Sequence, residues 1–359
     1  MSVPKFKPHT IILEHCNVCN LKCEFCCRAY TPEESRFLDL QLAERIFADL
    51  GTWIDKVRVD LSPVGEPFLN PYLFDYIKLA LKYIHKPYIM AFTNGIPLMR
   101  NPELVVKFFE SGGHQLVIDI YKPELDEFAS ILVERVKKRL EALDVEIYYY
   151  RDDKGCVYDL EGRQVHKFSL YHYKSGRYLL INRVYEVEAK GRGRVRIFHN
   201  YAGKIPLGIS GVDYRLKPTK YCMRPYRELV IDYNGCVRLC CLCVWNDIIL
   251  GKFPEDGSLE EIWNNEIAWL YRYFLRVSKV KRVLSPCNLC SYHGGFIPVE
   301  RVSKPDFINV DNLEEVVKYV QQHQKRYIKY KHPYLFNPPE WRRRVLEGYN
   351  KRLSEWMVG

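Results

Sequence analysis

The chain has 359 residues, of which 47% are hydrophobic and 27% charged, and its formal net charge is +10. This composition is typical of a water-soluble globular protein, and the length predicts more than one domain. The sequence contains no run of about 18 apolar residues and no apolar signal region at its N-terminus. We therefore expect a cytoplasmic protein without a membrane partner.

Thirteen cysteines are unusually many for such a chain. A disulfide framework belongs mainly to short secreted domains, whereas clustered cysteines in a reducing compartment indicate metal or iron–sulfur ligation. The positive charge is explained either by a solvated basic surface or by an anionic partner such as a leader peptide, a nucleotide or RNA.

The first two hundred residues alternate short apolar runs with amphipathic stretches, a pattern that predicts parallel strands joined by crossover helices. Strands are expected at 10–14, 57–61, 88–93, 115–121 and 145–150. Helices are expected at 38–50, 72–83, 102–110 and 124–143. Residues 155–194 are rich in tyrosine, charge and glycine, and they predict a hairpin-like insertion before a sixth strand at 195–199. In such barrels the chemistry lies in the loops that follow the strands.

The rest of the chain is divided by its cysteines. After a first domain at 1–205, we expect a second unit at 206–300 and a cysteine-free tail at 301–359. In the tail, Asp311 followed by Glu314 resembles a capping box. The apolar residues that follow at helical spacing are Leu313, Val316, Val317 and Val320. Interleaved basic and aromatic residues would suit nucleic acid, but the apolar stripe favours a helix docked on the protein, so we expect no nucleic-acid partner.

The first cysteine group is Cys19, Cys23 and Cys26, with the spacing CxxxCxxC, directly after the first expected strand. Three thiolates can hold three irons of a [4Fe–4S] cube and leave the fourth open to an external ligand, whereas structural zinc prefers four closed ligands. Cys16 and Cys27 are close in sequence. A zinc site that includes Cys16, or a cluster that uses Cys27 in place of Cys26, are therefore the alternatives.

Two further motifs follow the next strands in order. Gly65-Glu66-Pro67 follows the second expected strand, and Thr93-Asn94-Gly95 follows the third. With the cysteine spacing, they resemble the radical S-adenosylmethionine (SAM) superfamily. The resemblance implies that SAM binds the open iron, that the Gly-Glu-Pro turn contacts the SAM amino group, and that Phe25 lies near the adenine. Val64 departs from the family, which usually has glycine there.

The same resemblance implies two weaker assignments and a fold. Asp119 on the fourth strand would lie near the SAM ribose, and Arg151 after the fifth would meet the SAM carboxylate through its bidentate guanidinium. The alternative for Arg151 is a solvated position beside Asp152 and Asp153. The implied fold is α/β: a partial (β/α)6 barrel of the TIM type, a small α+β domain for an auxiliary cluster, and a helical tail.

The second cysteine group has the pattern C-x12-G-x4-C, a long gap, and CxxC. Its members are Cys222, Gly235, Cys240, Cys287 and Cys290. This group resembles the auxiliary-cluster domains called SPASM and twitch, and it implies an auxiliary [4Fe–4S] cluster on the four cysteines. No cysteine follows Cys290, which favours the single-cluster twitch form. A closed zinc site is the alternative. Cys236, Cys241 and Cys243 are further candidates in place of Cys240.

The resemblance also implies an activity. A one-electron reductant of the ferredoxin or flavodoxin kind would reduce the first cluster, SAM would be cleaved to a 5′-deoxyadenosyl radical, and the radical would abstract a substrate hydrogen atom. We expect a maturase-like enzyme that modifies a peptide or protein. The alternatives are a small-molecule oxidoreductase or epimerase resembling the sugar-alcohol dehydrogenases, and a non-enzymatic iron–sulfur electron carrier. The two turn motifs argue against the carrier, which has no need of SAM contacts.

Overall fold

The computed structural model describes residues 5–31, 35–62, 64–150, 156–160, 163–167, 176–184, 198–202, 204–209, 212–214, 222–276, 284–292 and 302–347. The chain divides into two compact units. We call residues 11–20 and 35–197 the core unit, and residues 1–10, 21–34 and 198–359 the auxiliary unit. This differs from the predicted division at 205 and 300, because residues 21–34 and the tail both belong to the auxiliary unit.

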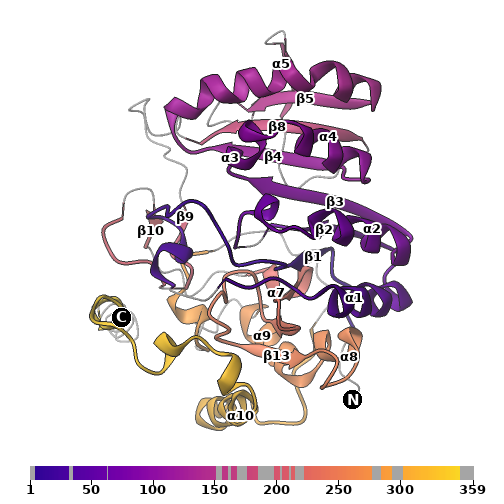
Figure 1. Cartoon of the computed structure of the whole chain (residues 1–359). Helices are drawn as coiled ribbons and strands as arrows, with labels where there is room; N and C mark the ends of the chain where they lie inside the picture. Colours follow the sequence, from indigo (N-terminus) through magenta and orange to yellow (C-terminus); the bar gives the residue numbers. More distant parts are fainter. Residues whose placement is uncertain are drawn as a thin grey trace. The chain divides into compact units, whose positions relative to one another are not determined.

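The core unit contains the alternating strands and helices that the sequence predicts (Figure 1). Its first strands are β1 (Thr10–Leu13), β2 (Lys56–Asp60), β3 (Lys86–Thr93), β4 (Gln115–Ile120) and β5 (Val145–Tyr150). Its helices are α1 (Leu40–Trp53), α2 (Leu73–Tyr83), α3 (Ile96–Arg100), α4 (Glu103–Glu110) and α5 (Asp126–Ala142). Strands β2, β3 and β4 are parallel neighbours, and every residue of β4 is buried, as expected for a central strand covered on both faces.

The sixth parallel strand is not the predicted one. Strand β8 (Arg177–Arg183) lies between β4 and β5 and is parallel to both. The apolar run at its centre, Leu179 to Ile181, is typical of a strand buried on both faces, but the polar residues around it predicted a hairpin. Residues 195–197 lie outside the described ranges. Phe198–His199 forms β9, which pairs with β10 (Val212–Asp213) in the auxiliary unit.

Part of the predicted insertion is confirmed. Strands β6 (Cys156–Tyr158) and β7 (Gln164–Lys167) form an antiparallel hairpin, and β6 pairs with the outer edge of β5. The mixed sheet of the core unit therefore follows the order β1-β2-β3-β4-β8-β5-β6-β7. This order places the carboxyl ends of β2, β3, β4 and β8 at one edge, where the predicted site residues lie.

The auxiliary unit contains a small antiparallel sheet with helices, as predicted for an α+β domain. Its order is β13 (Ile249–Lys252), β12 (Cys236–Arg238) and β11 (Glu228–Ile231). Helix α7 (Arg224–Arg227) precedes β11, and α8 (Leu259–Trp263) and α9 (Glu266–Arg276) follow β13. Helix α8 begins with a capping box between Ser258 and Glu261.

The tail docks on this sheet through α10 (Leu313–Lys325). The Gln324 amide pairs with both backbone groups of Ile249: its Nε2 donates to the carbonyl at 2.8 Å, and its Oε1 accepts from the N–H at 3.1 Å. Val316 and Val320 are buried on the same face. The docked helix is thus confirmed, but Leu313 and Val317 of the predicted stripe are 41% and 39% exposed. The N-cap is Asn312, one residue after the predicted Asp311.

Short 3-10 turns follow at Ile328–Tyr330 and Pro333–Leu335, and residues 340–347 are helical. Among the described helices there is none whose length and apolar character would allow it to span a lipid bilayer.

Candidate active site

Glu66 connects the two turn motifs of the core unit. Its carboxylate is 2% exposed and accepts three hydrogen bonds. Oε1 accepts from the Thr93 hydroxyl at 2.6 Å and from the Phe68 N–H at 3.2 Å, and Oε2 accepts from the Asn94 N–H at 2.8 Å. Burial raises the pKa of Glu66 to about 7, although these donors oppose the rise. The side chain therefore fastens the end of β2 to the end of β3.

Gly65 allows the same turn to approach the segment that follows β1. A Cβ atom at this position would lie 2.7 Å from the Cys16 carbonyl oxygen and 2.9 Å from the Val18 oxygen, distances that side chains do not tolerate. The Glu66 N–H also donates to the Val18 oxygen at 2.7 Å. The glycine of the motif is thus required by backbone packing just before Cys19.

Cys16 is packed into this contact. Its thiol lies 3.6 Å from the Glu66 carbonyl oxygen, and burial raises its pKa to about 12. A buried thiol of this kind is held protonated, whereas iron and zinc bind thiolates. This burial argues against Cys16 as a ligand, and the set Cys19, Cys23 and Cys26 remains a prediction.

Asn94 brings the first ligand candidate next to the two turns. Its Nδ2 donates to Asn20 Oδ1 at 2.7 Å and lies 3.9 Å from Cys19 Sγ. Its Oδ1 accepts from the Ile96 N–H at 3.1 Å, so the amide is fixed at both ends. Gly95 follows with a φ of +77°, which lets the chain leave β3 and begin α3. The core unit thus places Cys19 beside the Thr-Asn-Gly turn.

His15 and Asn70 form a buried pair that the sequence did not reveal. His15 Nε2 lies 2.5 Å from the Leu61 carbonyl oxygen, and Nδ1 lies 2.9 Å from Asn70 Nδ2. Asn70 Nδ2 also donates to the His15 carbonyl oxygen at 2.8 Å. Burial lowers the pKa of His15 to about 4, so the ring is neutral and its Nε2–H is the donor to Leu61. The pair fixes the chain between β1 and the cysteine loop.

Asp119 lies on β4 with a partner from the unpredicted strand. In the register of β4 and β8 it is opposite Asn182, whose Nδ2 donates to Asp119 Oδ1. The Tyr121 hydroxyl donates to Oδ2 at 3.2 Å. Asn182 was missed because its strand was predicted as part of a hairpin; the apolar run before it was the available signal. Arg151 lies outside the described residues.

The other two cysteines of the first motif belong to the auxiliary unit. The Cys26 N–H donates to the Cys23 carbonyl oxygen at 2.9 Å, and a 3-10 turn, Cys27–Tyr30, begins directly afterwards. Cys23, Phe25 and Cys26 are partly exposed, whereas Cys27 is buried. An accessible thiol suits a ligand of a cluster that also binds SAM, so the geometry favours Cys26 over Cys27.

The second cysteine group comes from three segments of the auxiliary unit: before α7, after β12, and at a 3-10 turn near residue 288. Cys222 and Cys240 are buried, and Cys287 and Cys290 are partly exposed at the two ends of the 3-10 turn Cys287–Leu289. Cys236 lies in an apolar cluster with Ile249 and Tyr327, which makes it a packing residue.

Two of the remaining cysteines stay close to this group. Cys243 Sγ lies 3.7 Å from Cys240 Sγ. Cys241 Sγ accepts from Arg224 Nη1 at 2.7 Å. Among the twelve cysteines whose side chains the structure describes, none forms a disulfide.

Trp245 connects this loop to the first cysteine motif and to the tail, all within the auxiliary unit. Its indole N–H donates to Thr31 Oγ1 at 2.6 Å, and Thr31 Oγ1 donates to the Cys27 carbonyl oxygen at 2.7 Å. The His332 ring stacks on the indole with ring centres 5.1 Å apart. Three rings of the tail, those of His332, Tyr334 and Trp341, therefore pack around Trp245.

Comparison with known proteins assigns the family. Residues 13–145 match the radical SAM superfamily, and residues 222–291 match SPASM, an iron–sulfur cluster-binding domain. The chain belongs to the radical SAM superfamily. This radical SAM enzyme carries a C-terminal SPASM domain. The two domains imply a SAM-binding [4Fe–4S] cluster, SAM itself and auxiliary iron–sulfur ligation.

The fold is similar to that of BtrN, a solved structure. BtrN in complex with AdoMet and 2-DOIA has a TM-score of 0.57 and 15% identity, and the match covers 80% of this chain and 95% of BtrN. Native anSMEcpe with bound AdoMet has a TM-score of 0.43 and 16% identity, over 75% of this chain and 84% of that one. Streptococcus suis SuiB bound to S-adenosylmethionine has a TM-score of 0.40 and 13% identity, over 76% and 72%. Among curated proteins, no sequence relative is found.

Proposed function

We propose that this radical SAM enzyme cleaves SAM reductively at a [4Fe–4S] cluster held by Cys19, Cys23 and Cys26, and that it abstracts a hydrogen atom from its substrate. When bound, the cluster and SAM supply the electron and the 5′-deoxyadenosyl radical for this chemistry. The observation that carries the proposal is the position of Asn94: its backbone is bound by Glu66 while its amide lies 3.9 Å from Cys19 Sγ. The proposed ligand Cys19 and the two turn motifs therefore lie next to one another in the core unit.

The turns would bind SAM mainly through their backbone. The Glu66 carboxylate is already occupied by donors from Thr93, Asn94 and Phe68, so its side chain holds the turn in shape. The Glu66 and Pro67 carbonyl oxygens already accept from the Leu69 and Asn70 N–H groups, each at 3.1 Å, so the Gly65 carbonyl is the proposed acceptor for the SAM amino group. Asp119, fixed by Asn182 and Tyr121, would accept from the ribose hydroxyls. Phe25 and Arg151 complete the proposed set, at the adenine and at the SAM carboxylate.

The auxiliary cluster would be a single [4Fe–4S] cluster bound by Cys222, Cys240, Cys287 and Cys290. The burial of Cys236 among apolar side chains supports this set, because it removes one of the competing cysteines. Four thiolates close the cluster to exogenous ligands, which suits electron transfer to or from a substrate radical. The external reductant would be a one-electron carrier of the ferredoxin or flavodoxin kind.

The substrate class that we propose is a peptide or protein, because a net charge of +10 suits an anionic leader segment. A small molecule is the second candidate, since BtrN, whose fold this chain shares, was solved with AdoMet and 2-DOIA. The two are separated by incubating the reconstituted enzyme with deuterated peptides encoded beside its gene and with deuterated polyols. Deuterium should enter 5′-deoxyadenosine from the peptide; transfer from polyols alone would establish the second candidate.

The SAM-cleaving assignment is tested by changing Cys19, Cys23 and Cys26 together to Ala. The triple variant should lose reductive formation of 5′-deoxyadenosine while retaining about four irons in the auxiliary cluster after anaerobic reconstitution. Cys236→Ala is the matched control, because it removes a buried cysteine that is no ligand in this proposal, and it should retain both clusters. Undiminished 5′-deoxyadenosine formation by the triple variant would contradict the assignment.

A further inference from the structure

Residues Asn200, Tyr201, Ala202 and Lys204 form a short segment beside the auxiliary cysteines, and we call it the latch. The side chains of Asn200 and Lys204 are both completely buried. Burial of an amide or an ammonium group is unfavourable unless hydrogen bonds or an opposite charge compensate for the lost water. The partners of these two side chains therefore show what the latch is built to hold.

Asn200 holds the backbone on both sides of Cys290. Its Nδ2 donates to the Leu289 carbonyl oxygen at 2.8 Å, and its Oδ1 accepts from the Ser291 N–H at 2.9 Å. The Asn200 N–H also donates to Ser291 Oγ at 3.0 Å. The carboxamide thus pairs with the chain as a neighbouring strand would, and it fixes the orientation of the one peptide segment that carries Cys290.

Lys204 holds the loop that carries Cys240. Its Nζ lies 2.8 Å from Asp247 Oδ2 and donates to the Leu242 carbonyl oxygen at 3.5 Å and to the Tyr201 carbonyl oxygen at 3.1 Å. Leu242 is two residues after Cys240, and Asp247 closes the same loop. A buried positive charge therefore lies inside the loop that supplies one of the proposed cluster ligands.

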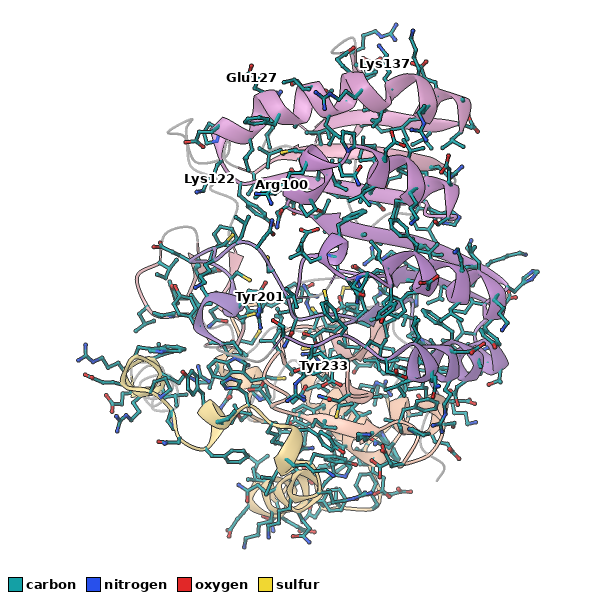
Figure 2. All side chains as sticks on the ribbon, in the orientation of Figure 1. Arg100, Lys122, Glu127, Lys137, Tyr201 and Tyr233 are labelled. Carbon is teal, nitrogen blue, oxygen red and sulfur yellow. The ribbon has the colours of Figure 1, made fainter. Side chains whose placement is uncertain are left out.

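The backbone between these two anchors is strained. Tyr201 has a φ of +46° and Ala202 a φ of +52°, in the left-handed region that residues with a side chain rarely adopt. Two consecutive residues remain there only when their surroundings determine the conformation. Asn200 and Lys204 are those surroundings. Loss of hydration and then the neighbouring Cys27 and Cys26 thiols raise the pKa of the Tyr201 phenol. The Tyr201 side chain is labelled in Figure 2.

We propose that the latch is a positioning element for the auxiliary cluster: Asn200 sets the geometry of Cys290, and Lys204 sets that of the Cys240 loop while adding a positive charge beside the cluster. The proposal rests on the ligand set given above. Outer partners of this kind change metal-site affinity by about 10- to 100-fold when they are removed, and charges near an iron–sulfur cluster tune its reduction potential.

The first experiment uses the full chain with Cys19, Cys23 and Cys26 changed to Ala, so that only the auxiliary cluster is read. Asn200→Ala in this background should lose iron to a chelator about tenfold faster than its parent. Asn264→Ala is the matched control: it is buried, bonds the Phe6 N–H at 2.8 Å and the Phe6 carbonyl oxygen at 3.2 Å, and lies away from the cysteine loops. Its rate should stay within about twofold of the parent.

The second experiment measures the reduction potential of the same cluster. Lys204→Met removes the buried ammonium group beside the Asp247 carboxylate and leaves Lys331, whose Nζ donates to the Asp247 carbonyl oxygen at 2.7 Å. Reduction should therefore become harder by about tenfold in the equilibrium constant, or ~59 mV for a one-electron couple. Lys204→Met combined with Asp247→Asn removes both charges, so the reduction potential should return most of the way to its value in the parent. A merely structural role for Lys204 would give no recovery in the double variant.

The outcomes distinguish a failure of the latch proposal from a failure of the proposed ligand set. A parent without an iron–sulfur chromophore would overturn the proposed auxiliary ligands, and the latch with them. A normal parent cluster with unchanged iron loss in Asn200→Ala would overturn the latch alone. Equal iron loss in Asn200→Ala and Asn264→Ala would also overturn it, because the effect would then follow general destabilisation.

Discussion

The hydroxyl of Thr93 is expected to stabilise the core unit more at high pH than at low pH. It donates to a Glu66 carboxyl group whose pKa burial raises to about 7. Thr93→Val keeps the shape of the side chain and removes this donor. Above pH 7 the lost bond is to a carboxylate, and below it the lost bond is to a neutral acid.

The sizes of these two bonds give the expected difference. A hydrogen bond to a charged group contributes about 1.5–3 kcal/mol and one between neutral groups about 0.5–1.5 kcal/mol. Thr93→Val should therefore lower the free energy of unfolding by about 1 kcal/mol more at pH 8.5 than at pH 5. The bond that Thr93 Oγ1 accepts from the Gly95 N–H, at 3.0 Å, is lost equally at both pH values.

The coupling between proton binding and folding gives the same direction for this pH dependence. Glu66 binds its proton more tightly in the folded chain than in the unfolded one, so its contribution to stability is fully present below about pH 4.5, the usual glutamate value. That contribution falls as pH rises from about 4.5 to about 7, by an order of 3 kcal/mol. Removing a donor to the carboxylate raises the pKa of Glu66 in the folded protein further. The loss of stability with rising pH is therefore larger in Thr93→Val.

The assay is urea unfolding of the cluster-free protein at pH 5 and pH 8.5. Tyr76→Phe is the control, because it removes a buried hydroxyl that donates to the Leu38 carbonyl oxygen at 2.5 Å, a partner that does not titrate. Its loss should be the same at both pH values. An equal loss for Thr93→Val at the two pH values, or a larger loss at pH 5, would refute the reasoning about Glu66.

Four further changes test other contacts. Gly65→Ala should destabilise the core unit by about 1–3 kcal/mol in urea, since its Cβ would overlap the Cys16 and Val18 oxygens; an unchanged midpoint would show that the turn can move away. Asn182→Ala should cost about 1–3 kcal/mol and weaken SAM binding measured by calorimetry, and unchanged binding would separate Asp119 from the SAM site. Gln324→Ala should lower the melting temperature by removing both bonds to Ile249, whereas the exposed Leu313→Ser should leave it unchanged; equal shifts would argue against the docked face. Trp245→Phe should destabilise the auxiliary unit by about 1 kcal/mol, and no change in its urea midpoint would mean that the Thr31 bond contributes nothing.

The turn motifs could be located from the sequence because each is contiguous and follows a strand. Parallel strands bring such turns to one edge, so the neighbourhood of Glu66, Thr93 and Asn94 was predictable without coordinates. The contact of the Asn94 amide with Cys19 follows from the same geometry. Local spacing was sufficient for these residues.

Residues whose role depends on a distant partner were not predictable. The role of His15 depends on its contact with Asn70, and the role of Asn200 depends on its bonds to the backbone around Cys290. In α10, helical spacing predicted that Val317 is buried, but the helix docks along the line of Val316, Val320 and Gln324. The polar Gln324 therefore lies on the docked face of α10, where the spacing predicted only apolar residues. Its amide binds the backbone groups at the edge of β13.

The place of β8 in the sheet has a consequence for biosynthesis. Strand β4 emerges from the ribosome well before β8, its neighbour in the finished sheet, and β5 has no final position until β8 arrives. During that interval the edge of β4, all six residues of which end up buried, is available for wrong pairing. A nascent or truncated chain that stops before Arg177 is thus expected to aggregate. Residues 13–145, the stretch that matches the superfamily, do not include β8.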